Sequence, residues 1–158
     1  MSILLRIDCR EKEFITQLTE MVAIQPKYQC IQFVVEQLSI GDMILTNSET
    51  QQDLVVIERK TVSDLMSSVR DGRYNEQSFR LDKYSLHNHN IIYLIEGDME
   101  RYNEAKGRLE KKTLYSAIVA LQYFKGFSVI RTKNINETSE FIIHYANKLQ
   151  KEQAKLGY

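Results

Sequence analysis

Leu54-Val55-Val56-Ile57, followed directly by Glu58-Arg59-Lys60, is the segment most informative about the architecture. Four consecutive apolar residues are typical of a central strand whose two faces are both covered. Residues two apart in a strand project to the same side, so Glu58 and Lys60 point together from the end of this apolar run. Because open α/β sheets tend to bind ligands at strand ends, the segment predicts a buried strand and a candidate site together.

Strands and helices alternate on both sides of this run. We expect further strands at residues 3–9, 30–35, 42–45, 91–95 and 127–130. We expect helices at 11–23, 61–70, 73–86 and 113–125, and a last helix from about residue 136. The polar segments 47–53 and 97–112 are expected to be loops. Interleaved strands and helices in a chain of 158 residues predict a single α/β domain.

Composition narrows the function classes without choosing one. Lys+Arg and Asp+Glu are both 21, whereas a general nucleic-acid binder is usually basic overall. Basic residues nevertheless gather within 101–112, as an enzyme that holds a polyanion would need. No apolar run approaches the length of a membrane span, so no membrane contact is expected. Cys9 and Cys30 are too few for a disulfide framework and are expected to be small buried residues of an intracellular protein.

Glu58 and Lys60 allow two interpretations. They could form a surface ion pair, worth about 0–1 kcal/mol. Alternatively, Glu58 could bind a hard metal ion while Lys60 orients or deprotonates an attacking water. Mg²⁺ needs further oxygen ligands, and Asp42, which follows the turn Ile40-Gly41, is the best second carboxylate. Asp8 and Asp64 could support the site, although Asp64 also fits a helix-capping box that begins at Thr61.

Glu58-Arg59-Lys60, followed by Asp64, resembles the ERKxxxD signature of the XPF-type structure-specific endonucleases. The resemblance continues, in chain order, across residues 8–96. It includes Asp8-x-Arg10-Glu11, Ile40-Gly41-Asp42, the segment Asp71-Gly72-Arg73-Tyr74-Asn75-Glu76-Gln77-Ser78-Phe79-Arg80-Leu81, and Leu94-Ile95-Glu96. The helical segment is most similar to the crossover-junction branch of that family. The resemblance implies a restriction-endonuclease-like fold, a central mixed sheet flanked by helices.

The family resemblance also implies roles for particular residues. Asp42 and Glu58 would be metal ligands, and Lys60 would position or activate the water. Asp8 and Asp64 would be supporting catalytic carboxylates. Arg59 would belong to the same site, although strand alternation turns its side chain away, so its backbone carbonyl or a side chain curling round the strand end is expected to act. Three residues at i, i+4 and i+7 of one helix would contact DNA phosphates: Arg73, Gln77 and Arg80.

The implied reaction is phosphodiester hydrolysis in branched double-stranded DNA, such as 3′ flaps, forks or nicked junctions, with Mg²⁺ or Mn²⁺ as cofactor. An inactive scaffolding subunit of such a complex is the alternative, but the acidic residues and the lysine are all present. A junction resolvase of the wider restriction-like group is a third possibility. The helix over 71–81 argues against that third reading.

The C-terminal part of the sequence bears on assembly. Phe141-Ile142-Ile143 wraps apolar surface around the last helix, with Tyr145 and Leu149 extending it. A well-buried helix would explain this pattern, as would a homodimer or heterodimer contact of the kind the family resemblance implies. We expect a nuclease domain over 1–153, a polar tail over 154–158 and no helix-hairpin-helix module, in a protein of the nucleus or cytoplasm.

Overall fold

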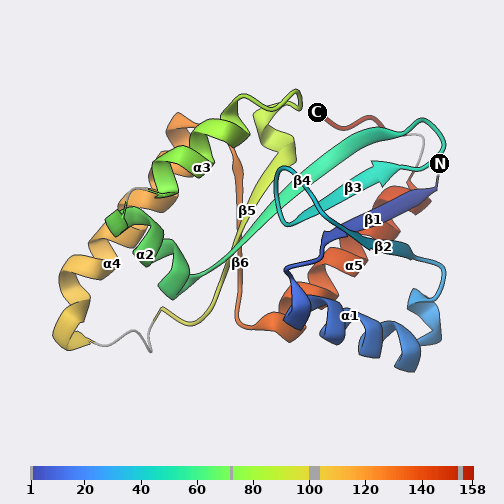
Figure 1. Ribbon diagram of the computed structural model, residues 1–158, viewed down its shortest axis with the longest axis horizontal. Helices are drawn as coiled ribbons and strands as arrows, with labels where there is room; N and C mark the ends of the chain where they lie inside the picture. The colour runs from blue at the N-terminus through green and yellow to red at the C-terminus, as the bar shows by residue number, and fades with distance from the viewer. Residues whose placement is uncertain (1, 72, 100–103, 153–154) are drawn as a thin grey trace.

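A computed structural model of the chain describes residues 2–71, 73–99, 104–152 and 155–158. Its strands are β1 (Ile3–Asp8), β2 (Gln32–Glu36), β3 (Met43–Asn47), β4 (Gln52–Thr61), β5 (Ile91–Glu96) and β6 (Ser128–Thr132). Its helices are α1 (Lys12–Ile24), α2 (Val62–Asp71), α3 (Arg73–Asp82), α4 (Glu104–Val119) and α5 (Ile135–Lys151). Three short turns are also helical: η1 (Pro26–Tyr28), η2 (Asn88–Asn90) and the π-turn η3 (Ala120–Phe124). Figure 1 shows their arrangement.

The strands form one mixed sheet in the order β2-β1-β3-β4-β5-β6. Strand β3 pairs antiparallel with both β1 and β4, whereas the pairs β1–β2, β4–β5 and β5–β6 are parallel. The apolar run over 54–57 lies inside β4, between two neighbouring strands, as its composition predicts. The expected α/β class with a mixed sheet flanked by helices is therefore confirmed.

Helices cover the two faces of the sheet. On one face, α1 and α5 pack on side chains such as Ile7, Ile57 and Leu94. On the other face, α3 and η3 pack on Val56 and Tyr93, and α2 with α4 packs beside them. The two helix groups stand on opposite sides of the twisted sheet in Figure 1. Alternation along β4 therefore sends Ile57 and Val56 into separate cores, and it assigns the polar residues that follow to opposite faces in the same way.

The last helix, α5, is well buried, which is the first of the two explanations for its apolar sequence. Ile142 and Ile143 are fully buried in the core that α5 shares with α1 and β1. Phe141, Tyr145 and Leu149 are partly buried against the same core. Packing within the chain accounts for the consecutive apolar residues, so they give no separate sign of a dimer contact.

Three local expectations are wrong. The loop expected over 97–112 is helical from Glu104, so the helix does not begin at Thr113. The segment is rich in helix-forming Glu, Ala, Lys and Arg, but Gly107 and the lack of an apolar stripe made it resemble a loop. The loop expected over 47–53 ends earlier, since β4 begins at Gln52. Cys9 and Cys30 are exposed rather than buried, because Cys9 follows the end of β1 and Cys30 lies in the turn between η1 and β2.

No helix in the part of the chain that the structure describes has both the length and the apolar character needed to cross a membrane.

Candidate active site

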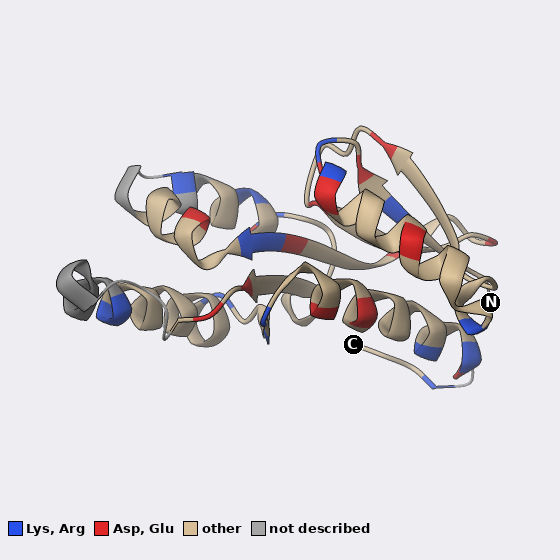
Figure 2. Cartoon of the chain, turned by 90° about the horizontal axis from the view of Figure 1, so that it is seen from below, with Lys and Arg blue, Asp and Glu red and all other residues tan. Residues whose placement is uncertain are grey.

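A cavity of about 310 Å³ opens where the end of β4 meets the turn before β3 and the helices α2 and α3. Its lining is Arg10, Ser39, Ile40, Gly41, Asp42, Glu58, Arg59, Lys60, Asp64, Gln77, Arg80 and Leu81. In Figure 2 the same end of β4 carries an acidic position followed by basic ones. Most of the residues that sequence reasoning selected from distant segments therefore share one hollow.

Asp42 reaches the cavity because the chain turns sharply just before it. Gly41 has a φ of +71°, and a Cβ there would meet the Val56 side chain at 2.6 Å, so glycine is needed. The Asp42 amide donates to the Ile57 carbonyl at 2.9 Å, and the Arg59 amide donates to Asp42 Oδ2 at 2.8 Å. Backbone hydrogen bonds thus fix the carboxylate against β4.

Glu58 and Lys60 project from the same face of β4 as Val56. The ammonium Nζ of Lys60 lies 3.9 Å from Glu58 Oε1. Both side chains are mostly buried, 11 % exposed for Glu58 and 13 % for Lys60, which distinguishes this pair from a solvated surface ion pair. The lysine is directed toward the carboxylate, as the strand spacing predicts.

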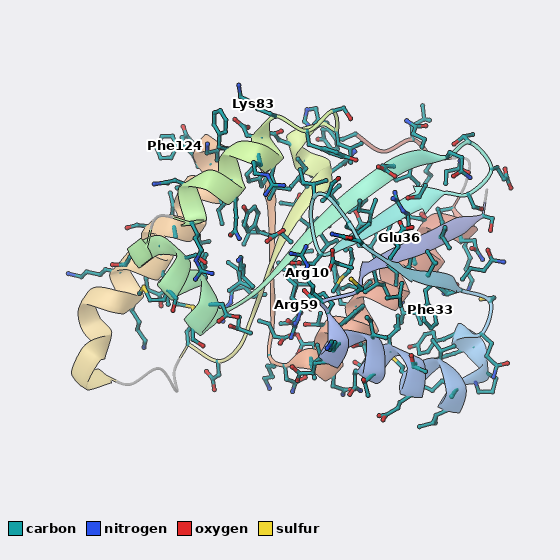
Figure 3. The ribbon with its side chains drawn as sticks, in the orientation of Figure 1. Arg10, Phe33, Glu36, Arg59, Lys83 and Phe124 are labelled. Carbon is teal, nitrogen blue, oxygen red and sulfur yellow. The ribbon has the colours of Figure 1, made fainter. Side chains whose placement is uncertain are left out.

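Glu11 is a third carboxylate at the site, and sequence reasoning gave it no role. Its carboxyl lies beside that of Asp42, and the two can share a hydrogen bond when one of them is protonated. The signal was present, since Glu11 ends the motif Asp8-x-Arg10-Glu11 at the junction of β1 and α1. Arg10 also lines the cavity, and Figure 3 shows it near Arg59 beside the start of α1.

The acidic groups crowd one another. Burial raises the pKa of Asp42 to about 7, with the charge of Glu58 as the next cause. Burial likewise raises the pKa of Glu58 to about 7, while Lys60 opposes the shift. For Glu11 burial again dominates, the charge of Asp42 adds to it, and the pKa rises to about 7. Without a cation, this part of the protein favours protonated carboxyls.

Arg59 lies on the opposite face of β4 from Glu58 and Lys60, as strand alternation predicts. Its guanidinium makes two hydrogen bonds to Glu96, of 3.1 and 2.6 Å, and one of 3.0 Å to Glu11. We expected its backbone carbonyl, or a side chain curling round the strand end, to act at the site. The backbone group that binds Asp42 is instead the N–H of Arg59, and its side chain reaches the site through Glu11.

Asp8 does not line the cavity. It is fully buried, and its oxygens accept hydrogen bonds from the Arg10 amide, from the Arg10 guanidinium and from the Leu38 amide. The Arg10 side-chain hydrogen bond lowers the pKa of Asp8 to about 2. These contacts tie the end of β1 to the segment before the Gly41 turn, which is a scaffolding arrangement.

The remaining candidates divide between the cavity and its surroundings. Asp64 lines it from the first turn of α2, where its amide also donates to the Thr61 hydroxyl at 3.1 Å, as a capping motif would. Gln77 and Arg80 line it from α3, and Arg80 is held by a 2.8 Å hydrogen bond to the Ser39 carbonyl. Arg73 is exposed and lies outside the lining.

The donor set fits a hard divalent cation. Across residues 2–71, 73–99, 104–152 and 155–158, no group of three or more His, Cys, Asp or Glu side chains is arranged to hold a metal. Mg²⁺ is commonly bound by only one or two carboxylates, with waters and substrate phosphate completing its shell. Asp42 and Glu58 supply such a pair, and their mutual repulsion is what a cation would relieve.

Residues 7–145 match the ERCC4 domain family. The chain belongs to the ERCC4 domain family. The match covers both the cavity and the sheet that builds it. The resemblance to XPF-type nucleases that the sequence motifs indicated is therefore confirmed.

Relatives of this ERCC4 domain include the Dictyostelium discoideum "Probable crossover junction endonuclease mus81", which is 30 % identical over 94 % of this chain and 18 % of its own length. The human "Structure-specific endonuclease subunit MUS81" is 33 % identical over 74 % of this chain and 22 % of its own length. The chain thus spans about a fifth of either relative. In the solved structure "XPF from Aeropyrum pernix, complex with DNA", the fold agrees with a TM-score of 0.69 at 25 % identity, over 98 % of this chain and 68 % of that one.

Proposed function

We propose that this ERCC4 domain is a metal-dependent endonuclease that hydrolyses phosphodiester bonds in branched DNA, such as 3′ flaps, forks and nicked junctions. The observation that carries the proposal is the convergence of Asp42, Glu58 and Lys60 in one cavity. The names of the relatives support the reaction class, and the DNA complex of the Aeropyrum pernix protein supports the kind of partner.

Mg²⁺ or Mn²⁺ would be held by Asp42 and Glu58. When bound, such an ion supplies Lewis-acid polarisation of the scissile phosphate and charge compensation in the transition state. Buried carboxylates with raised pKa values are the groups expected at a site that a cation completes.

Lys60 would orient the attacking water or take its proton. Its Nζ lies beside Glu58, so a water held by that carboxylate would also be within reach of the amine. Asp64 lines the same cavity and would support the network as a further acceptor. By resemblance to the XPF-type nucleases, the products would carry 5′-phosphate and 3′-hydroxyl ends.

Gln77 and Arg80 would contact phosphates that flank the scissile bond, because both line the cavity from α3. Arg73 begins the same helix and would contact a phosphate farther along the strand. Phosphate contacts of this kind fix the register of the DNA without reading its sequence. Selection of branched over linear DNA would then depend on the shape of the DNA.

A panel of labelled substrates tests the proposal. Flap, fork, nicked-junction and linear duplexes are incubated with Mg²⁺ and with either the parent chain or Glu58→Gln. We expect the parent to cut branched substrates faster than linear ones and Glu58→Gln to be inactive. Equal cleavage by parent and variant would refute the assignment, whereas binding of branched DNA without any cleavage would favour the scaffolding alternative.

We further propose that the domain pairs with a second copy or a related subunit through its C-terminal part. An exposed apolar stripe of α4 and η3 supports this, because each of its side chains is more than half exposed: Tyr115, Val119, Tyr123 and Phe124. Sedimentation at low micromolar concentration tests it. A monomer of 18.6 kDa would remove the idea, and Val119→Glu should shift a dimer toward that mass.

The extent of the nuclease domain over 1–153 and the polar tail over 154–158 stay predictions, and residues 153 and 154 lie outside the described part. We also propose that the protein is located inside the cell, in the nucleus or the cytoplasm, because DNA is its proposed substrate.

A further inference from the structure

A chain of hydrogen bonds runs behind the candidate active site, on the α1/α5 face of the sheet. Glu96 ends β5 and Thr132 ends β6, and the two residues are register partners. Thr138, in the second turn of α5, donates to Glu96 Oε1 at 2.6 Å and lies 2.7 Å from the Thr132 hydroxyl. These three side chains are 0 to 7 % exposed. Water does not reach side chains that are this buried, so these groups depend on one another for their hydrogen bonds.

The direction of each bond follows from proton counting. A hydroxyl has one proton to donate. Since Thr138 donates to Glu96, Thr132 must be the donor in the Thr132–Thr138 bond. Glu96 then accepts from Thr138 and from two N–H groups of Arg59. Every member is satisfied, which is the condition under which a buried polar network rigidifies a structure.

The network ends at the active-site carboxylates. With its Nε and one Nη held by Glu96, the planar Arg59 guanidinium has a fixed orientation. Its other Nη donates to Glu11 at 3.0 Å, and the carboxyl of Glu11 lies beside that of Asp42. The Arg59 amide binds Asp42 directly. One residue therefore positions two of the three carboxylates from behind.

We propose that Glu96 and Thr138 are positioning residues of the active site: through Arg59 they hold Glu11 against Asp42 and so set the geometry that receives the divalent cation. The proposal rests on the proposed metal-dependent function. Neither residue lines the cavity, and Thr138 belongs to α5, a helix that no site residue occupies.

The test uses Thr138→Val, Thr138→Ser and a matched control in the 158-residue chain. Thr46→Val is the control, because Thr46 is also buried and donates one hydroxyl hydrogen bond, of 2.9 Å, to a different carboxylate, Asp53. Two readouts are needed: the solvent-exchange rate of the Arg59 Nε–H by NMR, and the affinity for Mn²⁺ by calorimetry.

We expect Thr138→Val to speed Arg59 Nε–H exchange and to weaken Mn²⁺ binding, each by about tenfold, as loss of an outer-shell partner does. Thr138→Ser should restore both to within about twofold of the parent. Thr46→Val should lower the unfolding temperature while leaving both readouts unchanged. If Thr138→Val and Thr46→Val behave alike, the positioning role is overturned.

Two further outcomes remain decisive. Should Thr138→Val fail to fold, Thr132→Val keeps the Thr138–Glu96 bond and should give a smaller loss in the same direction; no loss would overturn the proposal. If the parent itself binds no Mn²⁺, the proposed function fails, yet unchanged Arg59 exchange in Thr138→Val would still separately contradict the positioning role.

Discussion

The amide of Arg59 donates a 2.8 Å hydrogen bond to Oδ2 of Asp42. This bond joins the end of β4 to the turn that precedes β3, and it places the carboxylate of Asp42 in the cavity that Glu58 and Lys60 also line. The side chain of the same arginine binds Glu11. Main chain and side chain of one residue thus bring together segments that are far apart in the sequence.

Gly41→Ala tests whether the turn at Gly41 is needed to place Asp42 in the cavity. The new methyl group would need a positive φ and would press on Val56, so we expect destabilisation of about 1–3 kcal/mol and displacement of Asp42. Thermal unfolding followed by circular dichroism measures the first effect, and Mn²⁺ titration the second. Gly157→Ala is the control, since a Cβ there meets nothing within 4 Å. Equal behaviour of the two variants would count against the turn argument.

Stability without metal should fall as the pH rises through about 7. The pKa values of Glu11, Asp42 and Glu58 are each raised to about 7 in the folded protein, above their unfolded values. A raised carboxyl pKa gives stability that is fully present below the unfolded pKa and is lost as the pH passes the folded one. The unfolding temperature measured in a chelator should therefore be higher at about pH 5 than at about pH 8.

Two controls accompany the pH experiment. Glu58→Gln removes one raised group and should flatten the dependence. Mn²⁺ should raise the unfolding temperature more at about pH 8 than at about pH 5, because protons compete for the ligands. A flat profile for the parent in chelator would contradict the assigned electrostatics.

Asp8→Asn should act mainly on folding. Replacement leaves an amide facing donors from Arg10 and Leu38, and we expect a loss of about 2–4 kcal/mol. This corresponds to roughly 2–4 °C in unfolding temperature for each kcal/mol in a chain of this size. Mn²⁺ affinity of the folded variant should stay within about threefold of the parent. Glu20→Gln, an exposed change on α1, is the control. Normal stability with lost Mn²⁺ binding would instead make Asp8 a ligand.

Arg80→Ala should weaken DNA binding without removing Mn²⁺ binding. Loss of one phosphate contact should reduce the slope of log affinity against log salt by about 1. Fluorescence anisotropy with a flap substrate at several salt concentrations measures this slope. Lys148→Ala, an exposed basic residue on α5, should leave the slope unchanged. An identical slope for Arg80→Ala and the parent would remove Arg80 from the DNA interface.

The sequence was most informative where a local pattern carries the structure. The apolar run of β4, the spacing of Glu58 and Lys60, and the glycine turn before Asp42 each depend on a few neighbouring residues. Glu11 was missed because its approach to Asp42 depends on how the start of α1 lies against the end of β4, a tertiary relationship. The first half of α4 was missed because it has helical propensity without an apolar stripe.

The decisive measurement is the affinity for Mn²⁺ at chelator-controlled concentration, with the parent compared with Asp42→Asn, Glu58→Gln and Lys60→Ala. The claim is that Asp42 and Glu58 share one divalent ion beside Lys60. We predict that the parent binds Mn²⁺, that each carboxylate variant loses at least about tenfold in affinity, and that Lys60→Ala still binds Mn²⁺ but does not cleave DNA. Mn²⁺ binding of parental affinity in both carboxylate variants would contradict the account.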